Sequence, residues 1–190
     1  PQASMFRTVL FNTGLYYEST KGFQFASRHE TLLDPGLTKV WRVLGEFYAD
    51  SVPKGKDPNR KSFFNLVSKL INVPYGVRSG VHSLLLCAGY EALGREVLIF
   101  EKGEFIHQVS SITFEDICLR PSDFELRVVE LTSFQRKYLR QLIHLFQSEA
   151  DKPEEVPSEA ATPDELTGNL LASAYTTLED WMSSLPIAVF

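Results

Sequence analysis

The stretch NVPYGVRSGVHSLLLCAGYEAL, residues 72–93, decides most of what the sequence predicts about the fold. Its apolar part, residues 81–93, covers about 13 residues and includes three polar ones, whereas a membrane-spanning helix needs roughly 20 apolar residues. Pro74 removes a backbone donor and disfavours helical geometry in the residue before it, so a preceding helix must end there. Gly76 can adopt a positive φ angle. The stretch therefore predicts a tight corner followed by a buried helix.

Helical patterns lie on both sides of the corner. Asp34, followed by a proline, is typical of an N-cap before the first helical residue, and apolar residues then recur at helical spacing. A second helix is expected over residues 62–72 and a third over residues 79–94. The segment between the first two, SVPKGKDPNRK at residues 51–61, has the composition of a loop.

Strand patterns precede and follow these helices. Aromatic residues at near-alternate positions predict short strands over residues 5–27, with a hairpin over residues 15–26. After the third helix, EVLIF and FIHQV are two short strands joined by a turn at Gly103. A short helix fits residues 113–120, and FELRVVEL at residues 124–131 predicts a further strand.

Helix, sharp corner, helix and then a two-stranded hairpin is the order of a winged helix-turn-helix. Two short helices that cross steeply cannot cover their own apolar faces, so another helix and the hairpin would complete the core. We expect an α+β, mostly helical fold, with N-terminal strands and a hairpin over residues 1–36 and a winged helix-turn-helix-like core over residues 37–131. The alternative is a small α+β domain unrelated to that motif. The side chains expected to be nearly fully buried and in mutual contact are Leu84, Leu85, Leu70 and Phe64.

The C-terminal part predicts two amphipathic helices separated by a linker. Thr132 and Gln135 form a capping-box pattern at the start of a helix over residues 132–148. The apolar face of that helix comprises Phe134, Tyr138, Leu142, Leu145 and Phe146. Residues 149–163 are acidic and proline-containing, which is typical of a solvated linker. A C-terminal amphipathic helix is expected over residues 164–190.

The composition is that of an ordinary globular protein, with 190 residues and a formal net charge of −5. Cys87 and Cys118 show no CxxC spacing and are expected to be reduced core thiols. No signal-peptide pattern stands at the start, so we expect a cytoplasmic protein with no membrane partner. The chain begins without a methionine and ends on Phe190, which favours a fragment of a longer protein.

Motifs for catalysis and cofactor binding are absent from the sequence. It contains no G-x-x-x-x-G-K-[ST] loop, no G-x-S-x-G turn and no H-E-x-x-H pair. The four histidines are scattered, without a second ligand at metal spacing. We therefore expect no catalytic residues, no cofactor and no metal, and neither binding nor hydrolysis of ATP by this chain.

The charges are distributed unevenly along the chain. Residues 1–79 hold 11 Lys/Arg against 6 Asp/Glu, a net charge of +5, and residues 80–190 hold 8 against 18, a net charge of −10. Such an asymmetry can mark a nucleic-acid face at the basic end, although an ordinary solvated surface is the alternative. The candidate nucleic-acid contacts are Lys54, Lys56, Arg60, Lys61, Arg78, Arg136 and Arg140.

The helix predicted over residues 79–94 is too apolar to read bases in the major groove. Reading bases requires polar side chains on the exposed face, and here only Arg78 at its start is cationic. We expect this helix to be packed on both sides, as in a winged helix used for protein contacts.

Several segments together resemble one family of large proteins. LFNTGLY, VPYGVRSGVHSLLLCAGYEAL, EVLIFEKGEFI, ITFEDICLRPSDFELRVVEL and LEDWMSSLP occur in this order. They are similar to the middle region of very large bacterial P-loop ATPases of phage-defence and restriction islands, including BREX-type ATPases. The resemblance covers about residues 10–185. It implies that nucleotide-binding motifs lie elsewhere in a parent protein, because this chain has none.

Two functions from different classes follow as hypotheses. In the first, the chain is a non-catalytic accessory module that contacts other domains of a larger ATPase or a partner subunit. In the second, it is a winged-helix module that contacts DNA without sequence preference, through the basic loop. A surface on which the basic residues are scattered would disfavour the second hypothesis.

Overall fold

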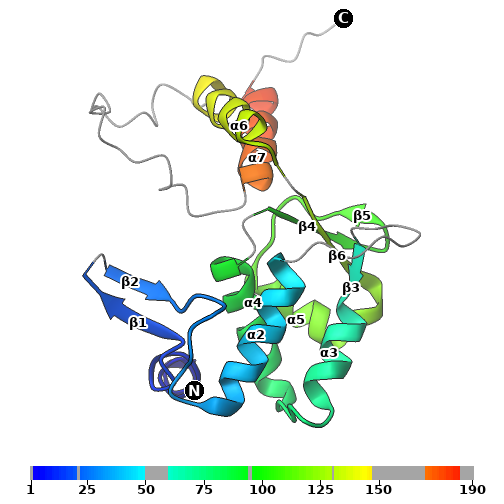
Figure 1. The fold of residues 1–190 in the computed structure, drawn as a ribbon. Coiled ribbons are helices and arrows are strands. Elements are labelled where there is room, and N and C mark those ends of the chain that lie inside the picture. Colours follow the sequence, from blue (N-terminus) through cyan, green and yellow to red (C-terminus); the bar gives the residue numbers. More distant parts are fainter. Residues whose placement is uncertain are drawn as a thin grey trace, which may run out of the picture.

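The computed structural model describes residues 2–20, 22–49, 60–93, 96–129, 131–146 and 170–184. In chain order its elements are α1 (Gln2–Met5), η1 (Phe6–Phe11), β1 (Tyr16–Ser19), β2 (Gly22–Phe25), α2 (Pro35–Ala49), β3 (Arg60–Ser62), α3 (Phe63–Ile71), α4 (Ser79–Leu93), β4 (Val97–Glu101), β5 (Glu104–Phe105), α5 (Ser111–Leu119), η2 (Pro121–Asp123), β6 (Phe124–Val128), α6 (Ser133–Phe146) and α7 (Leu170–Ser184). Figure 1 shows helices α2 to α5 below a small sheet, the β1–β2 hairpin beside them, and α6 paired with α7 above the sheet. The fold is α+β with small antiparallel sheets, as expected.

The N-terminal segment combines a short helical stretch with a hairpin. β1 and β2 pair antiparallel over four residue pairs, which confirms the predicted hairpin. The expectation of strands before it was wrong, because residues 2–11 are helical. Phe6, Val9 and Leu10 recur at helical spacing, and Leu10 is buried in the core. The period of the apolar residues in this stretch is therefore that of a helix.

Two predicted local signals around the central helices, the Asp34 cap and the turn at Gly76, are confirmed. Asp34 Oδ1 accepts hydrogen bonds from the amides two and three residues further on, at 2.7 and 3.1 Å, and so caps α2. Ser62 Oγ accepts from the amide two residues further on at 3.2 Å and caps α3. Between α3 and α4 the chain turns at Gly76, whose φ is 59°. A residue other than glycine would be strained in this conformation.

The sheet beside these helices has the strand order β3-β6-β4-β5, with every pair antiparallel. The predicted turn at Gly103 joins β4 to β5, but β5 has only two residues. The main partner of β4 is β6, which pairs with it along five residues. The assignment of residues 51–61 wholly to a loop was wrong, because β3 begins at Arg60. β3 is polar and pairs through its backbone, so no apolar pattern marks it.

The predicted core is correct in part. Leu70 and Leu85 are 0% and 1% exposed, as expected, but Phe64 is 52% exposed and Leu84 only half-buried. The buried face of α3 begins one residue earlier than predicted, because Phe63 rather than its neighbour lies on it. The buried residues of α3 are Phe63, Leu66, Val67 and Leu70.

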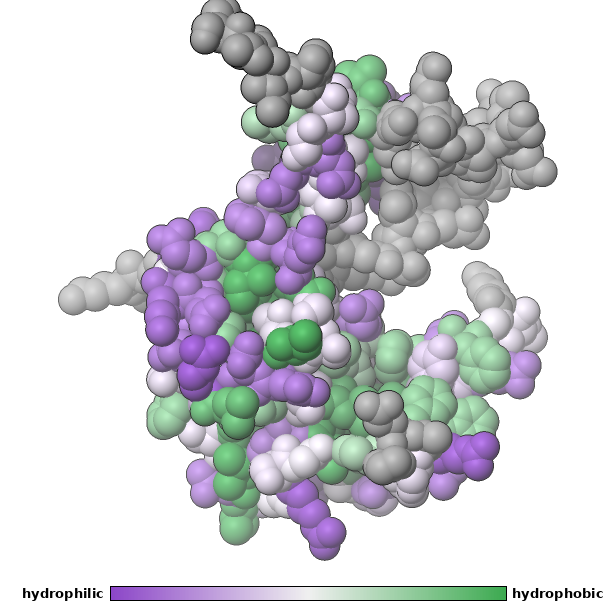
Figure 2. All heavy atoms as spheres, turned by 180° about the vertical axis from the view of Figure 1, so that it is seen from behind, coloured by the Kyte–Doolittle hydropathy of each residue, from purple (hydrophilic) through white to green (hydrophobic). Residues whose placement is uncertain are grey.

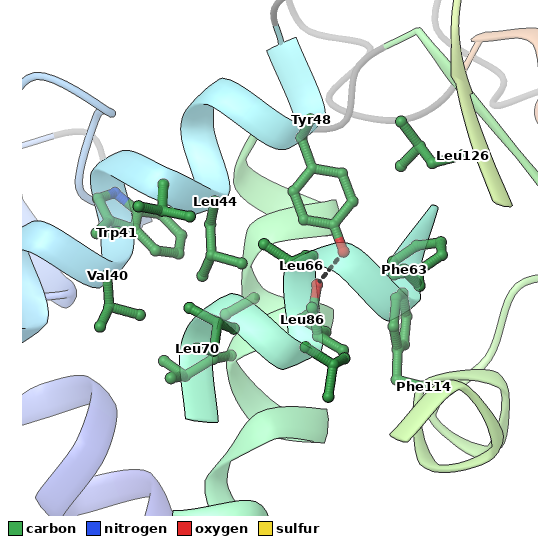
Figure 3. Packing of buried hydrophobic residues seen from close by; sticks show 14 of the residues in the cluster. Val40, Trp41, Leu44, Tyr48, Phe63, Leu66, Leu70, Leu86, Phe114 and Leu126 are labelled. Carbon is green, nitrogen blue, oxygen red and sulfur yellow. Dashed lines mark hydrogen bonds between the residues drawn. The ribbon is translucent and has the colours of Figure 1, made fainter. Parts of the chain in front are cut away.

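Helix α4 is covered from more than one side, as its composition predicts. Leu85 and Leu86 are adjacent in sequence, point about 100° apart on a helix, and are both fully buried. α2 and α5 both pack against α4. From α2 the hydroxyl of Tyr48 donates to the Leu86 carbonyl at 2.9 Å (Figure 3). Gly89 permits this close crossing, since a Cβ there would lie 2.8 Å from the Tyr48 ring.

Helices α6 and α7 form a separate pair above the sheet (Figure 1). The Thr132–Gln135 capping box is confirmed, because the Thr132 amide donates to Gln135 Oε1 at 2.8 Å and the Gln135 amide donates to Thr132 Oγ1 at 3.2 Å. Phe146, at the end of α6, contacts Trp181 near the end of α7, so the two helices run in the same direction. The predicted linker at 149–163 and the predicted start of the last helix lie outside the described residues.

The apolar face predicted for α6 is largely not the face that packs against α7. Ile143 is buried and Leu139 partly buried against Leu170 and Ala174 of α7. Three members of the predicted face are exposed instead: Phe134, Tyr138 and Leu145. α6 therefore carries two apolar faces, and α7 covers only one of them.

Candidate interaction surfaces

The two basic residues of β3, Arg60 and Lys61, bind acceptors within the chain. Arg60 Nη1 forms an ion pair with Glu125 Oε2 at 2.8 Å, and its guanidinium lies 4.9 Å from the centre of the Phe100 ring. Lys61 Nζ donates to the carbonyls of Glu46 and Phe47 at 2.8 and 2.6 Å. These carbonyls belong to the last turn of α2, so Lys61 acts as its C-terminal cap. Both residues therefore have structural roles.

The other predicted nucleic-acid contacts lie in several places. Arg136 Nε pairs with Glu96 Oε1, and Glu96 also accepts from the Leu131 amide at 3.1 Å. Arg78 is exposed just before α4, and Arg140 lies on α6. The remaining two, Lys54 and Lys56, lie outside the described residues. The structure brings Arg60 and Lys61 together and places Arg136 and Arg140 on another element.

A groove of about 370 Å³ lies between the second half of α2 and the start of α3. Its cationic side chains are Arg60, Lys61 and Lys69, and Glu46 is its acidic one. Lys69 is exposed and approaches the Tyr75 ring to 5.9 Å. Two of the predicted nucleic-acid contacts, Arg60 and Lys61, therefore line the same groove.

A second surface is apolar and lies on α6. Phe134, Tyr138 and Leu145 are 76%, 57% and 74% exposed. Their spacing of four and seven residues places them on one face of the helix, with Gln141 between the last two. We call these four residues the α6 stripe. Seen from behind, hydrophobic spheres interrupt the hydrophilic surface on the body and on the helix pair above it (Figure 2).

Two sets of contacts connect the helix pair to the body. The ring of Tyr175 on α7 stacks on His107 with centroids 4.1 Å apart and meets the Phe105 ring edge-on at 5.9 Å. Glu96, which precedes β4, binds Arg136 and the Leu131 amide. These contacts could not be predicted from the sequence, because the residues that form them are 35 to 70 positions apart.

The two cysteines are unreactive at neutral pH. Burial raises the pKa of Cys87, and Glu91 raises it further. Burial and then Glu115 raise the pKa of Cys118 to about 11. Both thiols are therefore protonated near pH 7, and a thiol is a poor nucleophile compared with its thiolate. In the part of the chain that the structure describes, no cluster of His, Cys, Asp and Glu could hold a metal ion.

His82 on α4 is 2% exposed, and its Nε2 donates to the Val77 carbonyl at 3.0 Å. Burial lowers the pKa of His82, and the hydrogen bond to the carbonyl opposes this in part. The unfolded chain therefore binds this proton more readily than the folded chain. The stability that depends on neutral His82 is complete above the unfolded pKa of about 6.5 and decreases as the pH falls below it.

We therefore expect His82→Gln to reduce the loss of stability between neutral pH and pH 5. Urea unfolding at several pH values measures this as the difference between the pH profiles of the variant and the unmodified chain. His29→Gln is the control, because His29 is exposed. Parallel profiles for the His82 variant and the unmodified chain would show that His82 does not titrate in this range.

Comparison with known proteins finds no match among protein-family models, curated proteins or solved structures. None of the described helices is both long enough and apolar enough to cross a membrane.

Proposed function

We propose that this chain is a non-catalytic accessory module that makes protein contacts within a larger bacterial ATPase. The observation that carries the proposal is the exposed α6 stripe. Three large apolar side chains on one helix face are unusual on a surface without a partner, and such patches often mark protein contacts. The sequence resemblance to phage-defence ATPases of the BREX type supports the larger context.

The order of elements supports a winged-helix-like core. α2, β3, α3 and α4 are followed by β4 and β6, and the sheet places β6 between β3 and β4. In this arrangement β3 and β6, the first and last strands of this sheet, are neighbours, and β5 pairs with β4 at the other edge. The helix after the corner, α4, is buried by α2 and α5. Because α4 is buried, it is better suited to protein contacts than to insertion into a DNA groove.

The test uses the coding sequence on either side of the chain. If this sequence encodes further domains, those domains are produced as separate polypeptides and mixed with the 190-residue chain. We expect a complex in size-exclusion chromatography that is lost with Leu145→Arg. Ile112→Arg is the matched control, since Ile112 is also exposed but lies on α5. The absence of flanking domains, or the absence of any complex with them, would contradict the proposal.

Contact with DNA is the second candidate function, and the basic groove favours it. Arg60, Lys61 and Lys69 line one groove, and Arg78 is exposed. Binding would rest on phosphate neutralisation, because α4 offers few base-reading groups. Counterion release then makes the affinity decrease steeply with salt, with a slope of log affinity against log salt of about −3 to −4 for three or four phosphate contacts.

If this function holds, Lys69→Gln combined with Arg78→Gln should weaken binding to any duplex and make the salt slope shallower by about 2. These positions avoid Lys61, whose replacement would uncap α2. Fluorescence anisotropy with two duplexes of unrelated sequence provides the measurement. Arg7→Gln combined with Lys102→Gln is the control with the same change in net charge, because both residues are exposed and lie outside the groove. No binding at low salt would rule out this candidate, and tight binding to one duplex would contradict its lack of sequence preference.

A further inference from the structure

We propose that the α6 stripe docks an acidic amphipathic helix of another polypeptide. This inference rests on the proposed function and names the chemistry of the partner. Two features carry it, namely the apolar spacing of the stripe and the sign of the charges beside it. Both are properties of the fourteen-residue helix SFQRKYLRQLIHLF.

The apolar part fits a helix better than an irregular segment. Phe134, Tyr138 and Leu145 extend along most of α6 in a narrow row. A straight row of this kind is matched by the ridge that residues at i, i+4 and i+7 form on a second helix. α7 already covers the opposite side through Ile143, so a docked helix would make α6 the middle member of a three-helix layer.

The charges beside the stripe are all of one sign. Lys137 and Arg140 are three residues apart and follow one edge of the stripe. α6 contains no Asp or Glu that could neutralise them. A partner with carboxylates along the matching edge would therefore gain favourable pairing, and a basic partner would be repelled.

Arg140 adds a specific indication that an acceptor binds here. Its Nε is buried and has no hydrogen-bond acceptor among the described residues. Arg140 also lines a hollow of about 510 Å³ together with Gln141, His144 and Leu145. A buried donor without an acceptor is costly. A carboxylate from the partner in this hollow could accept from Arg140, and such a charge-assisted hydrogen bond is stronger than one between neutral groups.

A second copy of the chain fits this surface less well. If two α6 stripes faced each other, Lys137 and Arg140 of both copies would meet with no carboxylate on either helix. Like charges across an interface are unfavourable. The charge pattern therefore disfavours packing of one α6 stripe on another and favours an acidic helix as the occupant.

A displayed library of helical peptides tests the proposal without knowledge of the natural partner. Each peptide has an alanine-rich helical scaffold, with apolar residues randomised along one face and charged or neutral residues randomised along both edges. The library is selected against the complete chain, and clones that also bind a Phe134→Ala, Leu145→Ala double variant are removed. Both side chains are mostly exposed, so their truncation should leave the fold intact.

We expect the selected peptides to carry Asp or Glu along one edge of the apolar row. Their Kd should rise about tenfold or more for Phe134→Ala or Leu145→Ala, as for a central contact residue. Arg140→Gln should weaken the acidic peptides more than versions with neutral edges. Ile112→Ala is the control, and it should leave the Kd within about twofold of the original, because it removes an exposed apolar residue away from α6.

Three results would overturn the inference. Selection of neutral or basic peptides would contradict the preference for an acidic partner. If every clone that binds the chain also binds the double variant equally well, the α6 stripe is not the docking site. A dimer in light scattering that becomes monomeric with Leu145→Ala would make a second copy the occupant. None of these results decides the proposed function, because complex formation with the flanking domains measures that separately.

Discussion

Replacing Trp41 with alanine is expected to lower the free energy of unfolding by about 3–5 kcal/mol, the range observed for truncating a buried large aromatic residue. Trp41 lies on α2, is 0% exposed and packs in the main core (Figure 3). Its Nε1 donates to the Ala26 carbonyl at 3.1 Å. The substitution therefore leaves a cavity and a carbonyl without its donor, at the place where the β1–β2 hairpin meets α2.

The second tryptophan of the chain provides a matched control. Trp181 on α7 is 39% exposed and contacts Phe146 outside the main core. Trp181→Ala should cost distinctly less than Trp41→Ala in urea unfolding. Trp41→Phe should fall between the unmodified chain and Trp41→Ala, since it keeps most of the ring volume and loses the hydrogen bond. Equal effects of Trp41→Ala and Trp181→Ala would contradict the position of Trp41 in the core.

The features that sequence analysis predicted well are local ones. The Asp34 cap, the turn at Gly76 and the Thr132–Gln135 box each depend on residues within four positions of one another. The chemistry of such signals is complete within a short segment, because a side-chain oxygen meets nearby amides or a glycine adopts a positive φ. They required no knowledge of how the chain folds over longer distances.

The features that sequence analysis missed depend on distant partners. β3 is a strand only because β6, more than 60 residues later, offers its backbone. The ion pair between Arg60 and Glu125 could not be predicted either, because the two residues are 65 positions apart. Arg136 is similar, because its acceptor Glu96 precedes β4. The sequence around a basic residue does not indicate whether a carboxylate elsewhere in the chain will pair with it.

The apolar face of α6 shows a different limit on what a pattern can predict. α6 has apolar residues on two sides, and an amphipathic pattern indicates a buried face without identifying what covers it. The sequence pattern identified only the face with the larger side chains as apolar. In the structure α7 covers the other face, through Ile143 and Leu139. The α6 stripe remained exposed for this reason, and it became the candidate docking surface.

The second large effect is expected at Leu85 on α4. Leu85→Ala should lower the free energy of unfolding by about 2–5 kcal/mol, because it removes buried methyl groups and leaves a cavity between α4 and its neighbours. Leu85 is 1% exposed and belongs to the main core. The surrounding side chains are anchored by the Tyr48–Leu86 hydrogen bond, so the site should collapse only partially.

Leu84→Ala is the matched comparison, since it changes the same residue type at the next position of the same helix. Leu84 is half-buried and lines a pocket of about 240 Å³ beside Met5 and Phe6. Truncation there enlarges a space that is already open, so it should cost less than truncation at Leu85. Helix propensity changes equally in the two variants, and the difference between their urea midpoints therefore measures packing alone. A larger loss at Leu84 than at Leu85 would mean that α4 is rotated about its axis relative to the arrangement described above.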